Sequence, residues 1–240
     1  QRQYAAPARR RMMQLVLMRH GQSIWNREGR FTGWSDSALS PQGEQESERA
    51  GRLLRQTGHT FDLCFTSELQ RATDTVRIVL TAMGLAQLPV QQSWRLNERH
   101  FGAMEGYNRL GAVRKFGLWP VLKCQLQFAA APPPLNPGDV RFPGNQPRYS
   151  NISKEDLPLA ESVQQTLLRV QPYWQETIVP QIQCGKRVLI VSHKNALRAL
   201  RLLLDGLSAA QAMRLTIATG QPLVYELDDK LNPVQRSYLD

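Results

Sequence analysis

The chain has 240 residues, which suits one large α/β domain, and 42% of them are hydrophobic while 21% are charged. No apolar run approaches the roughly 20 residues that a membrane-spanning helix needs, so composition excludes a membrane protein. The three cysteines lie far apart and are odd in number, which argues against a disulfide framework or a structural zinc site and favours a reducing compartment.

The formal net charge of +10 has two sources. The first eleven residues contain four arginines and no acid: Arg2, Arg9, Arg10 and Arg11. We expect residues 1–13 to form a basic, disordered extension, or the remnant of an organelle transit peptide. The second excess lies between Arg95 and Arg148 and suits a small polyanionic substrate. Because no basic stripe interleaved with aromatics and no recognition helix is found, a nucleic acid is not an expected partner. A membrane is not expected either, because no apolar run is long enough to span one.

The first half of the chain predicts two strand–helix pairs. An apolar strand over Gln14–Met18 is followed by a helix over 41–56, for which Ser40 provides the N-cap. A second short strand is predicted over Leu63–Thr66. The helix that follows it spans Glu68–Met83, where apolar residues recur at helical spacing.

The second half begins with residues 129–158, which are rich in proline and glycine and predict an irregular insert rather than core, suited to a lid. A strand over Lys186–Val191 and a helix over Lys194–Leu204 follow, and Leu223–Leu227 is expected to be the last strand. This order predicts an α/β fold in three layers, with a largely parallel central sheet and helices on both faces. We expect residues 14–240 to form a single domain.

Cations and histidines follow three of these strands. Arg19 and His20 come directly after the first strand, Arg71 comes shortly after the second, and His193 follows the third. Because the carboxyl ends of parallel strands share one edge of a sheet, we expect the four residues to converge. An isolated histidine is more often structural, but two histidines in equivalent positions weaken that alternative.

The same residues allow two kinds of ligand. Two histidines with Glu98 could hold a metal ion, but Arg19 and Arg71 would repel a divalent cation, so an anion is favoured and no metal is expected. A neutral imidazole can attack phosphorus, arginines can stabilise the transferred group, and a carboxylate can exchange the proton. The residues therefore predict phosphoryl transfer through a phosphohistidine.

Six segments in order resemble the cofactor-dependent phosphoglycerate mutases of the histidine phosphatase superfamily: LVLMRHGQSIWN, RFTGWSDSALSPQGEQES, FTSELQRATDT, RLNERHFGAMEGYNR, KRVLIVSHKNALR and ATGQPLVYELDDKLNPV. The resemblance runs from about Gln14 to the C-terminus. It implies a phosphoglycerate mutase-like fold and the interconversion of 2- and 3-phosphoglycerate in glycolysis and gluconeogenesis, with 2,3-bisphosphoglycerate as the priming phosphoryl donor. It also implies a cytoplasmic enzyme for a small phosphorylated three-carbon acid, as a homodimer or homotetramer.

The resemblance assigns roles to individual residues. It implies that His20 is the nucleophile and Glu98 the acid/base. Arg19, Arg71 and His193 would hold the phosphoryl group. Seven further residues would contact substrate: Ser23, Asn26, Thr32, Gly33, Arg109, Lys194 and Asn195.

Five positions depart from the family pattern. Gln125 and Leu126 stand where the family has two adjacent arginines that grip the carboxylate or second phosphate of the substrate. Phe101 replaces a tyrosine, Lys194 a glycine and Gln22 a glutamate. A weaker hold on the substrate favours hydrolysis, so two alternatives stay open: a phosphatase acting on another phosphorylated metabolite, and a non-catalytic relative that binds an anion.

Overall fold

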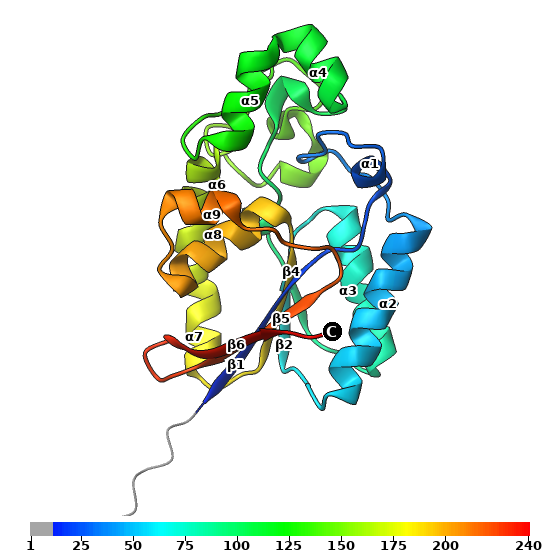
Figure 1. Cartoon of the computed structure of the whole chain (residues 1–240), viewed down its shortest axis with the longest axis vertical. Coiled ribbons are helices and arrows are strands. Elements are labelled where there is room, and N and C mark those ends of the chain that lie inside the picture. Colours follow the sequence, from blue (N-terminus) through cyan, green and yellow to red (C-terminus); the bar gives the residue numbers. More distant parts are fainter. Residues whose placement is uncertain (1–11) are drawn as a thin grey trace, which may run out of the picture.

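A computed structural model describes residues 12–240 and contains a six-stranded sheet of order β3-β2-β4-β1-β5-β6 (Figure 1). The first four of these strands pair in parallel, while β5 runs antiparallel to both of its neighbours. The prediction of an α/β fold with a largely parallel sheet is confirmed. The strands are β1 Met13–Arg19, β2 Leu63–Thr66, β3 Val90–Gln92, β4 Val188–Ser192, β5 Pro222–Leu227 and β6 Pro233–Tyr238.

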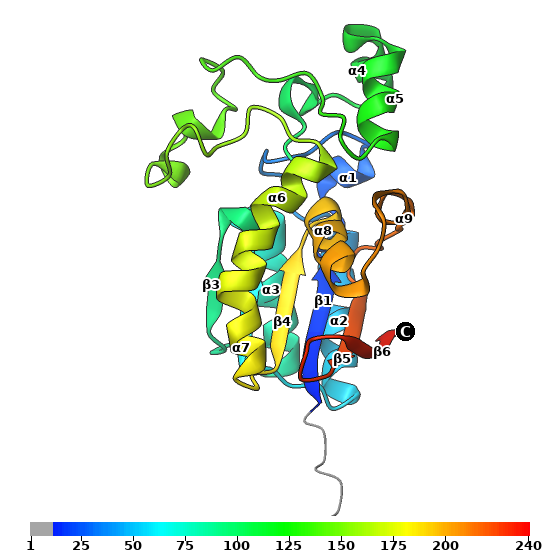
Figure 2. The same cartoon turned by 90° about the vertical axis from the view of Figure 1, so that its left-hand side faces the viewer.

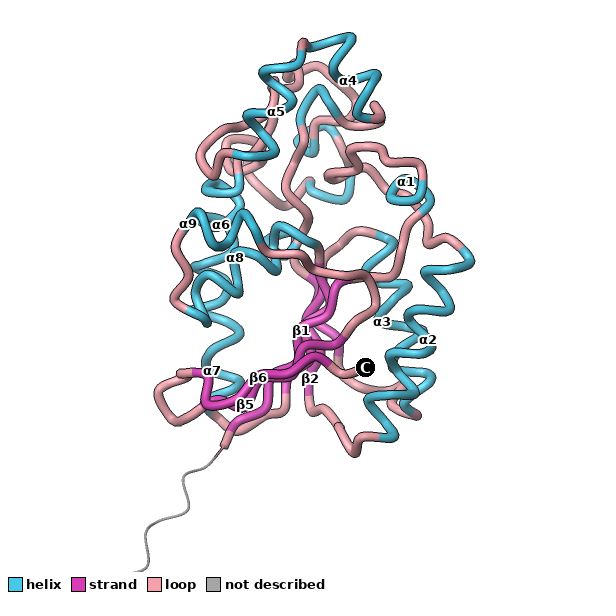
Figure 3. Tube along the Cα trace, viewed as in Figure 1, coloured by secondary structure: helices cyan, strands magenta, loops and turns pink. Residues whose placement is uncertain are grey.

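Helices cover both faces of the sheet, which gives the three layers visible in Figure 3. Strand β1 shows why: Leu15 and Leu17 pack with the residues of one helical layer, and Val16 and Met18 pack with those of the other. This alternation follows from the period of two along a strand. The layer on the side of Leu15 and Leu17 consists of α6 (Val163–Tyr173), α7 (Val179–Gln183) and α8 (Lys194–Asp205). The layer on the side of Val16 and Met18 consists of α2 (Pro41–Gln56) and α3 (Gln70–Met83).

Local sequence determines where the predicted helices begin and end. The Ser40 hydroxyl accepts a hydrogen bond from the Gly43 amide and caps α2, whose first residue is Pro41. Helix α3 ends at Gly84, which adopts φ 75° in the left-handed region, where glycine is unstrained. The helix predicted from Glu68 begins two residues later than expected, at Gln70.

A cap lies over the carboxyl ends of the parallel strands, at the top of Figure 2. It contains α1 (Ile24–Arg27), α4 (Arg109–Phe116) and α5 (Leu118–Leu126). The predicted insert over 129–158 also lies here and contains no α-helix or strand, only two short 3₁₀ turns. It is not outside the core, however, because four of its residues pack around Trp34 in a small separate cluster: Leu135, Phe142, Tyr149 and Leu157.

Two predictions need correction. Strand β5 is not the last strand, since β6 follows it. The helix α9 (Ala209–Arg214) precedes β5. The side chains of β6 are mostly exposed, so this edge strand carries no apolar alternation that would reveal it. The predicted extension over residues 1–13 lies outside the described residues except for its last two, and Met13 already belongs to β1. Within residues 12–240, no helix is both long and apolar enough to cross a bilayer.

Candidate active site

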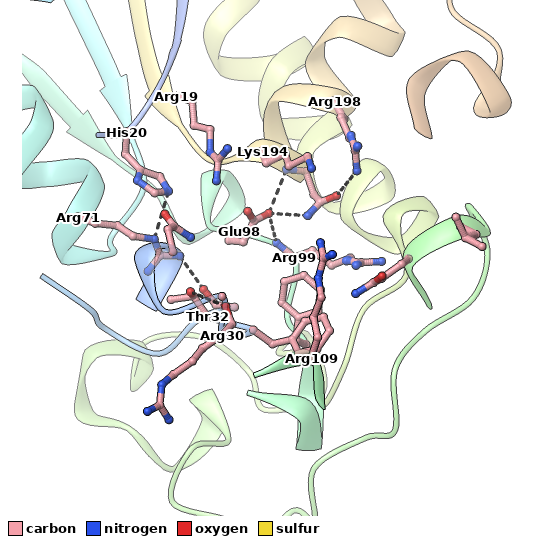
Figure 4. Close-up of a pocket in the computed structure, with 18 residues that line it drawn as sticks. Arg19, His20, Arg30, Thr32, Arg71, Glu98, Arg99, Arg109, Lys194 and Arg198 are labelled. Carbon is pink, nitrogen blue, oxygen red and sulfur yellow. Dashed lines mark hydrogen bonds between the residues drawn. The ribbon is translucent and has the colours of Figure 1, made fainter. Parts of the chain in front are cut away.

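A cavity of about 410 Å³ opens at the carboxyl ends of β1 and β4, beneath the cap (Figure 4). Its walls carry seven arginine or lysine side chains against one carboxylate, that of Glu98. Such a site favours a ligand with several negative charges. The lining residues are Arg19, His20, Asn26, Gly29, Arg30, Phe31, Thr32, Gly33, Arg71, Glu98, Arg99, Phe101, Arg109, Gln125, Leu126, Lys194, Asn195 and Arg198.

His20 follows β1 and is almost completely buried. Its Nδ1 lies 2.7 Å from the carbonyl oxygen of Gly21, so this nitrogen carries the hydrogen and Nε2 keeps its lone pair. Burial, together with the charges of Arg71 and Arg19, holds the pKa of His20 well below its usual range. The imidazole is therefore neutral at neutral pH, which is the state that a nucleophile requires.

Arg71 lies on the first turn of α3 and points at His20 from the side of the sheet that α2 and α3 cover. Its Nε donates to His20 Nε2 over 3.3 Å, and its terminal nitrogens donate to the carbonyls of Gly33 and Ser35 at 2.8 and 3.0 Å. Burial lowers its pKa to about 10, so the guanidinium is still charged at neutral pH. Arg71 thus joins His20 to the loop over residues 33–35.

His193 follows β4 and stands beside His20, with ring centroids 4.8 Å apart. The two imidazoles therefore meet, as the parallel strands predict. His193 Nε2 lies 2.7 Å from the Ser67 hydroxyl, while Nδ1 is buried and has no hydrogen-bond partner among residues 12–240. Burial and the nearby Arg71 hold the pKa of His193 well below its usual range. His193 is fully buried and does not itself line the cavity.

Glu98 presents one saturated and one free oxygen. Oε1 accepts hydrogen bonds from the Arg99 amide at 2.8 Å and from the backbone and side-chain nitrogens of Asn195, both at 3.0 Å. Oε2 accepts none from the described residues and is left to exchange a proton. Burial raises the pKa of Glu98, but the Arg99 amide and the charges of Arg19 and Arg71 outweigh it, so the pKa lies below its ordinary value.

Further residues fix Glu98 indirectly, through Asn195 and through its own backbone carbonyl. Arg198 donates to the side-chain oxygen of Asn195 at 3.1 Å, which turns the amide nitrogen of Asn195 toward the carboxylate. Arg169 is buried on α6, pairs with Glu161 at 2.7 Å and donates to the Glu98 carbonyl at 3.2 Å. These contacts fix both the side chain and the backbone of Glu98.

The predicted substrate-contacting residues divide into two groups. One residue, Ser23, does not line the cavity, because its hydroxyl caps α1 by accepting from the Asn26 amide at 3.1 Å. Four of the five departures from the family pattern lie in the cavity wall: Phe101, Gln125, Leu126 and Lys194. The other six predicted contacts line the cavity: Asn26, Thr32, Gly33, Arg109, Lys194 and Asn195.

Sequence reasoning missed three cations in the cavity wall, Arg30, Arg99 and Arg198. Two of them carried a usable signal: Arg99 directly follows Glu98, and Arg198 lies one helical turn after Asn195, on the same face of α8. The supporting pair of Arg169 and Glu161 gave none, because it lies outside the cavity. Among residues 12–240, no group of three histidine, cysteine or acidic side chains is placed to hold a metal ion.

Residues 15–140, more than half of the chain, match the family described as Histidine phosphatase superfamily (branch 1). The chain belongs to this superfamily. A superfamily relative from Nitrosomonas europaea, the "2,3-bisphosphoglycerate-dependent phosphoglycerate mutase 1", is 61% identical over 227 residues, covering 95% of this chain and 97% of that protein. The resemblance to the phosphoglycerate mutases that the sequence motifs indicated is thereby confirmed.

Solved structures of two phosphatases share the fold. A mycobacterial glucosyl-3-phosphoglycerate phosphatase aligns with a TM-score of 0.69 at 21% identity, over 94% of this chain and 97% of that chain. The alpha-ribazole phosphatase from Shigella flexneri aligns with a TM-score of 0.67 at 24% identity, over 93% of this chain and 95% of that chain. At these identities the likeness is one of fold alone.

Proposed function

We propose that this protein interconverts 2- and 3-phosphoglycerate through a phosphohistidine at His20, as a 2,3-bisphosphoglycerate-dependent phosphoglycerate mutase. The observation that carries the proposal is the neutral His20 imidazole, whose Nε2 faces a cavity of cations. The choice among phosphoryl-transfer reactions rests on the mutase that is 61% identical over nearly the whole chain.

The side chains divide the work of transfer. Nε2 of His20 forms the bond to phosphorus while the bond from phosphorus to the donor oxygen breaks. Arg19 and Arg71 stabilise the charge on the transferred group, and His193 completes the pocket around it. Oε2 of the ionised Glu98 takes the proton of the hydroxyl that attacks the phosphohistidine and returns it to the leaving oxygen when the phosphoryl group passes back to His20.

The donor set of the cavity fits 2,3-bisphosphoglycerate, because seven cations can neutralise two phosphates and a carboxylate. When bound, this cofactor supplies the phosphoryl group that primes His20. Further contacts to the phosphorylated three-carbon acid are assigned to five residues of the cavity wall: Asn26, Thr32, Gly33, Arg109 and Asn195. Ser23 would act through the loop that it caps rather than by contact.

A second candidate function is hydrolysis. Gln125 and Leu126 form part of the cavity wall and carry no charge, and Leu126 is 70% exposed. A product that is held weakly leaves before it can receive the phosphoryl group on its other oxygen, and water then takes its place. This observation favours some phosphatase activity alongside mutase activity.

One assay distinguishes these functions. The protein is incubated with 3-phosphoglycerate, with and without 2,3-bisphosphoglycerate, and 2-phosphoglycerate and inorganic phosphate are measured. Formation of 2-phosphoglycerate that depends on the bisphosphate is the expected result. Phosphate release without isomerisation would support the phosphatase. Anion binding without either product and without acid-labile phosphohistidine would leave a non-catalytic relative.

Several expectations accompany this proposal. We place the activity in the cytoplasm, within a single domain over residues 14–240, in a homodimer or homotetramer. The organelle alternative depends on the arginines of residues 1–11, which lie outside the described residues. Cell fractionation and sedimentation of the purified full chain would test these points.

A further inference from the structure

The cations of the cavity differ in how many hydrogen bonds they already donate to other groups of the protein. Five of the seven donate hydrogen bonds to backbone carbonyls, which fix their guanidinium groups in place and use part of their donor capacity. These five and their acceptors are Arg19 to Ile217, Arg30 to Gly106, Arg71 to Gly33 and Ser35, Arg99 to Cys124, and Arg198 to Met213 and Leu215.

Lys194 is different. It is half-buried in the cavity wall at the first position of α8, directly after His193, and its ammonium group makes no hydrogen bond or ion pair with the described residues. Arg109 is likewise free of such contacts, but it is exposed on α4. A partly desolvated cation without a partner lacks the compensation that buried charges usually have. Lys194 therefore has both the position and the free donors to bind an anionic group of a ligand.

The end of α5 adds no cation of its own to the wall. Gln125 and Leu126, at the end of α5, contribute an amide and an apolar side chain. A phosphoryl group held at His20 by Arg19 and Arg71 leaves any second anionic group of the same ligand dependent on the remaining free cations. Of these, Lys194 is the one that adjoins the histidine pair along the chain.

We propose that Lys194 determines specificity by binding the second anionic group of the substrate, a carboxylate or a second phosphate, so that the site selects small phosphorylated acids over simple phosphates. The inference rests on the proposed function, because it names the residue that recognises the non-reacting end of the same substrate. It makes Lys194 a binding residue and not part of the transfer chemistry.

The charge state of Lys194 gives this role a pH signature. Burial and the charges of Arg198, Arg19 and Arg109 lower its pKa to about 8, and Glu98 opposes them only partly. An anion bound to the ammonium raises the pKa again, so binding of a ligand with two anionic groups takes up a proton above pH 8. A ligand that reaches only the His20 end of the cavity is not coupled to this proton.

Binding measurements on the full-length protein test the proposal. Dissociation constants of 3-phosphoglycerate and of inorganic phosphate are measured by calorimetry between pH 7 and 9.5 for the wild type and two variants. Lys194→Met removes the charge, and Lys194→Arg keeps the charge without titrating in this range. Lys123→Met is the matched control, because Lys123 is an exposed lysine on α5 that does not line the cavity.

The expected pattern is specific to the role of Lys194. Lys194→Met should weaken 3-phosphoglycerate binding about tenfold to a hundredfold at pH 7, as loss of a charge-assisted hydrogen bond does, and change phosphate binding less than about threefold. In the wild type, affinity for 3-phosphoglycerate should fall about tenfold from pH 8 to 9.5, and Lys194→Arg should abolish this fall. Lys123→Met should match the wild type.

Two results would overturn the proposal. One is equal weakening of both ligands by Lys194→Met, which would indicate a general electrostatic or structural effect. The other is unchanged 3-phosphoglycerate binding in that variant. Because these are equilibrium measurements, they are independent of the mutase assay: a protein that binds as described but forms no 2-phosphoglycerate would contradict the proposed function and leave the role of Lys194 intact.

Discussion

His20 Nδ1 and the carbonyl oxygen of Gly21 are 2.7 Å apart, so the backbone of the next residue selects the tautomer of the His20 imidazole. In the neutral ring the hydrogen is held on this side, and Nε2 is presented to Arg71 and the cavity. A contact between two adjacent residues therefore sets which ring nitrogen keeps its lone pair, without any ligand.

The first prediction concerns this nitrogen. His20→Ala should abolish acid-labile labelling by radioactive 2,3-bisphosphoglycerate, because no other imidazole has an Nε2 lone pair in the cavity wall. His59→Ala, which changes a histidine in the loop after α2, should label like the wild type. Full labelling of the His20→Ala variant would move the nucleophile elsewhere, with His193 as the nearest candidate.

The second prediction concerns the carboxylate. Asn195→Ala removes one of the three donors to Glu98 Oε1 and should raise the pKa of Glu98, because the ionised carboxylate loses a hydrogen bond. Transfer from the phosphorylated enzyme to 3-phosphoglycerate needs ionised Glu98, so its rate should begin to fall at a higher pH as the solution is acidified. Rapid-quench measurements between pH 4.5 and 7.5 would record the shift. Asn151→Ala, at an exposed position of the insert, is the control, and an identical profile for both variants would contradict this role of Asn195.

The third prediction concerns stability. Burial and neighbouring arginines hold the pKa values of His20 and His193 below their ordinary value of 6.5. The unfolded chain therefore takes up protons below about pH 6.5 that the folded protein does not, and the free energy of unfolding falls as the pH is lowered. Each histidine should contribute at most about 1.4 kcal/mol per pH unit. Urea unfolding at pH 7.5, 6.5 and 5.5, without phosphate, should show this loss, and a smaller slope for His20→Gln.

The fourth prediction compares two glycines with positive φ. A Cβ on Gly33, at φ +54°, would lie 1.8 Å from Glu105 Oε1, whereas one on Gly58, at φ +78°, would meet nothing within 4 Å. Glu105 also accepts from the Trp34 amide at 3.0 Å, and the Gly33 carbonyl accepts from Arg71. Gly33→Ala should cost about 3 to 5 kcal/mol of unfolding free energy, and Gly58→Ala about 1 to 2. If urea unfolding gave similar losses of unfolding free energy for the two variants, the Glu105 side chain would move aside at little cost.

The fifth prediction adds a cation. Leu126→Arg places a guanidinium at an exposed position of the cavity wall and should strengthen 3-phosphoglycerate binding by about threefold to tenfold at low salt. Leu118→Arg makes the same change on α5 away from the cavity wall and should have little effect. Equal gains in both variants by calorimetry would point to long-range attraction instead of a local contact.

Much of the site was predictable because it depends on strand order. His20, His193 and Arg71 each follow an apolar strand, and parallel pairing of β1, β2 and β4 is enough to bring them together. Strand order does not place Glu98, since it follows a 3₁₀ turn over Trp94–Leu96 and not a strand.

What escaped the sequence was the support around the site and the polar edges of the fold. Arg169 reaches Glu98 across 71 residues of chain, and no periodicity encodes such a contact. Helix α5 was missed because Pro120 lies in its first turn, where proline is tolerated, although in a sequence it indicates a break. β3 and β6 were missed because neither is buried.

Those two strands have a consequence for how copies of the chain meet. β3 has three residues, all exposed, and β6 begins with Pro233 and carries Arg236. Short, polar or proline-bearing borders discourage one sheet from growing into another. Self-association into fibrils through backbone pairing is therefore disfavoured at both margins, and any dimer or tetramer is expected to form through helix or loop contacts.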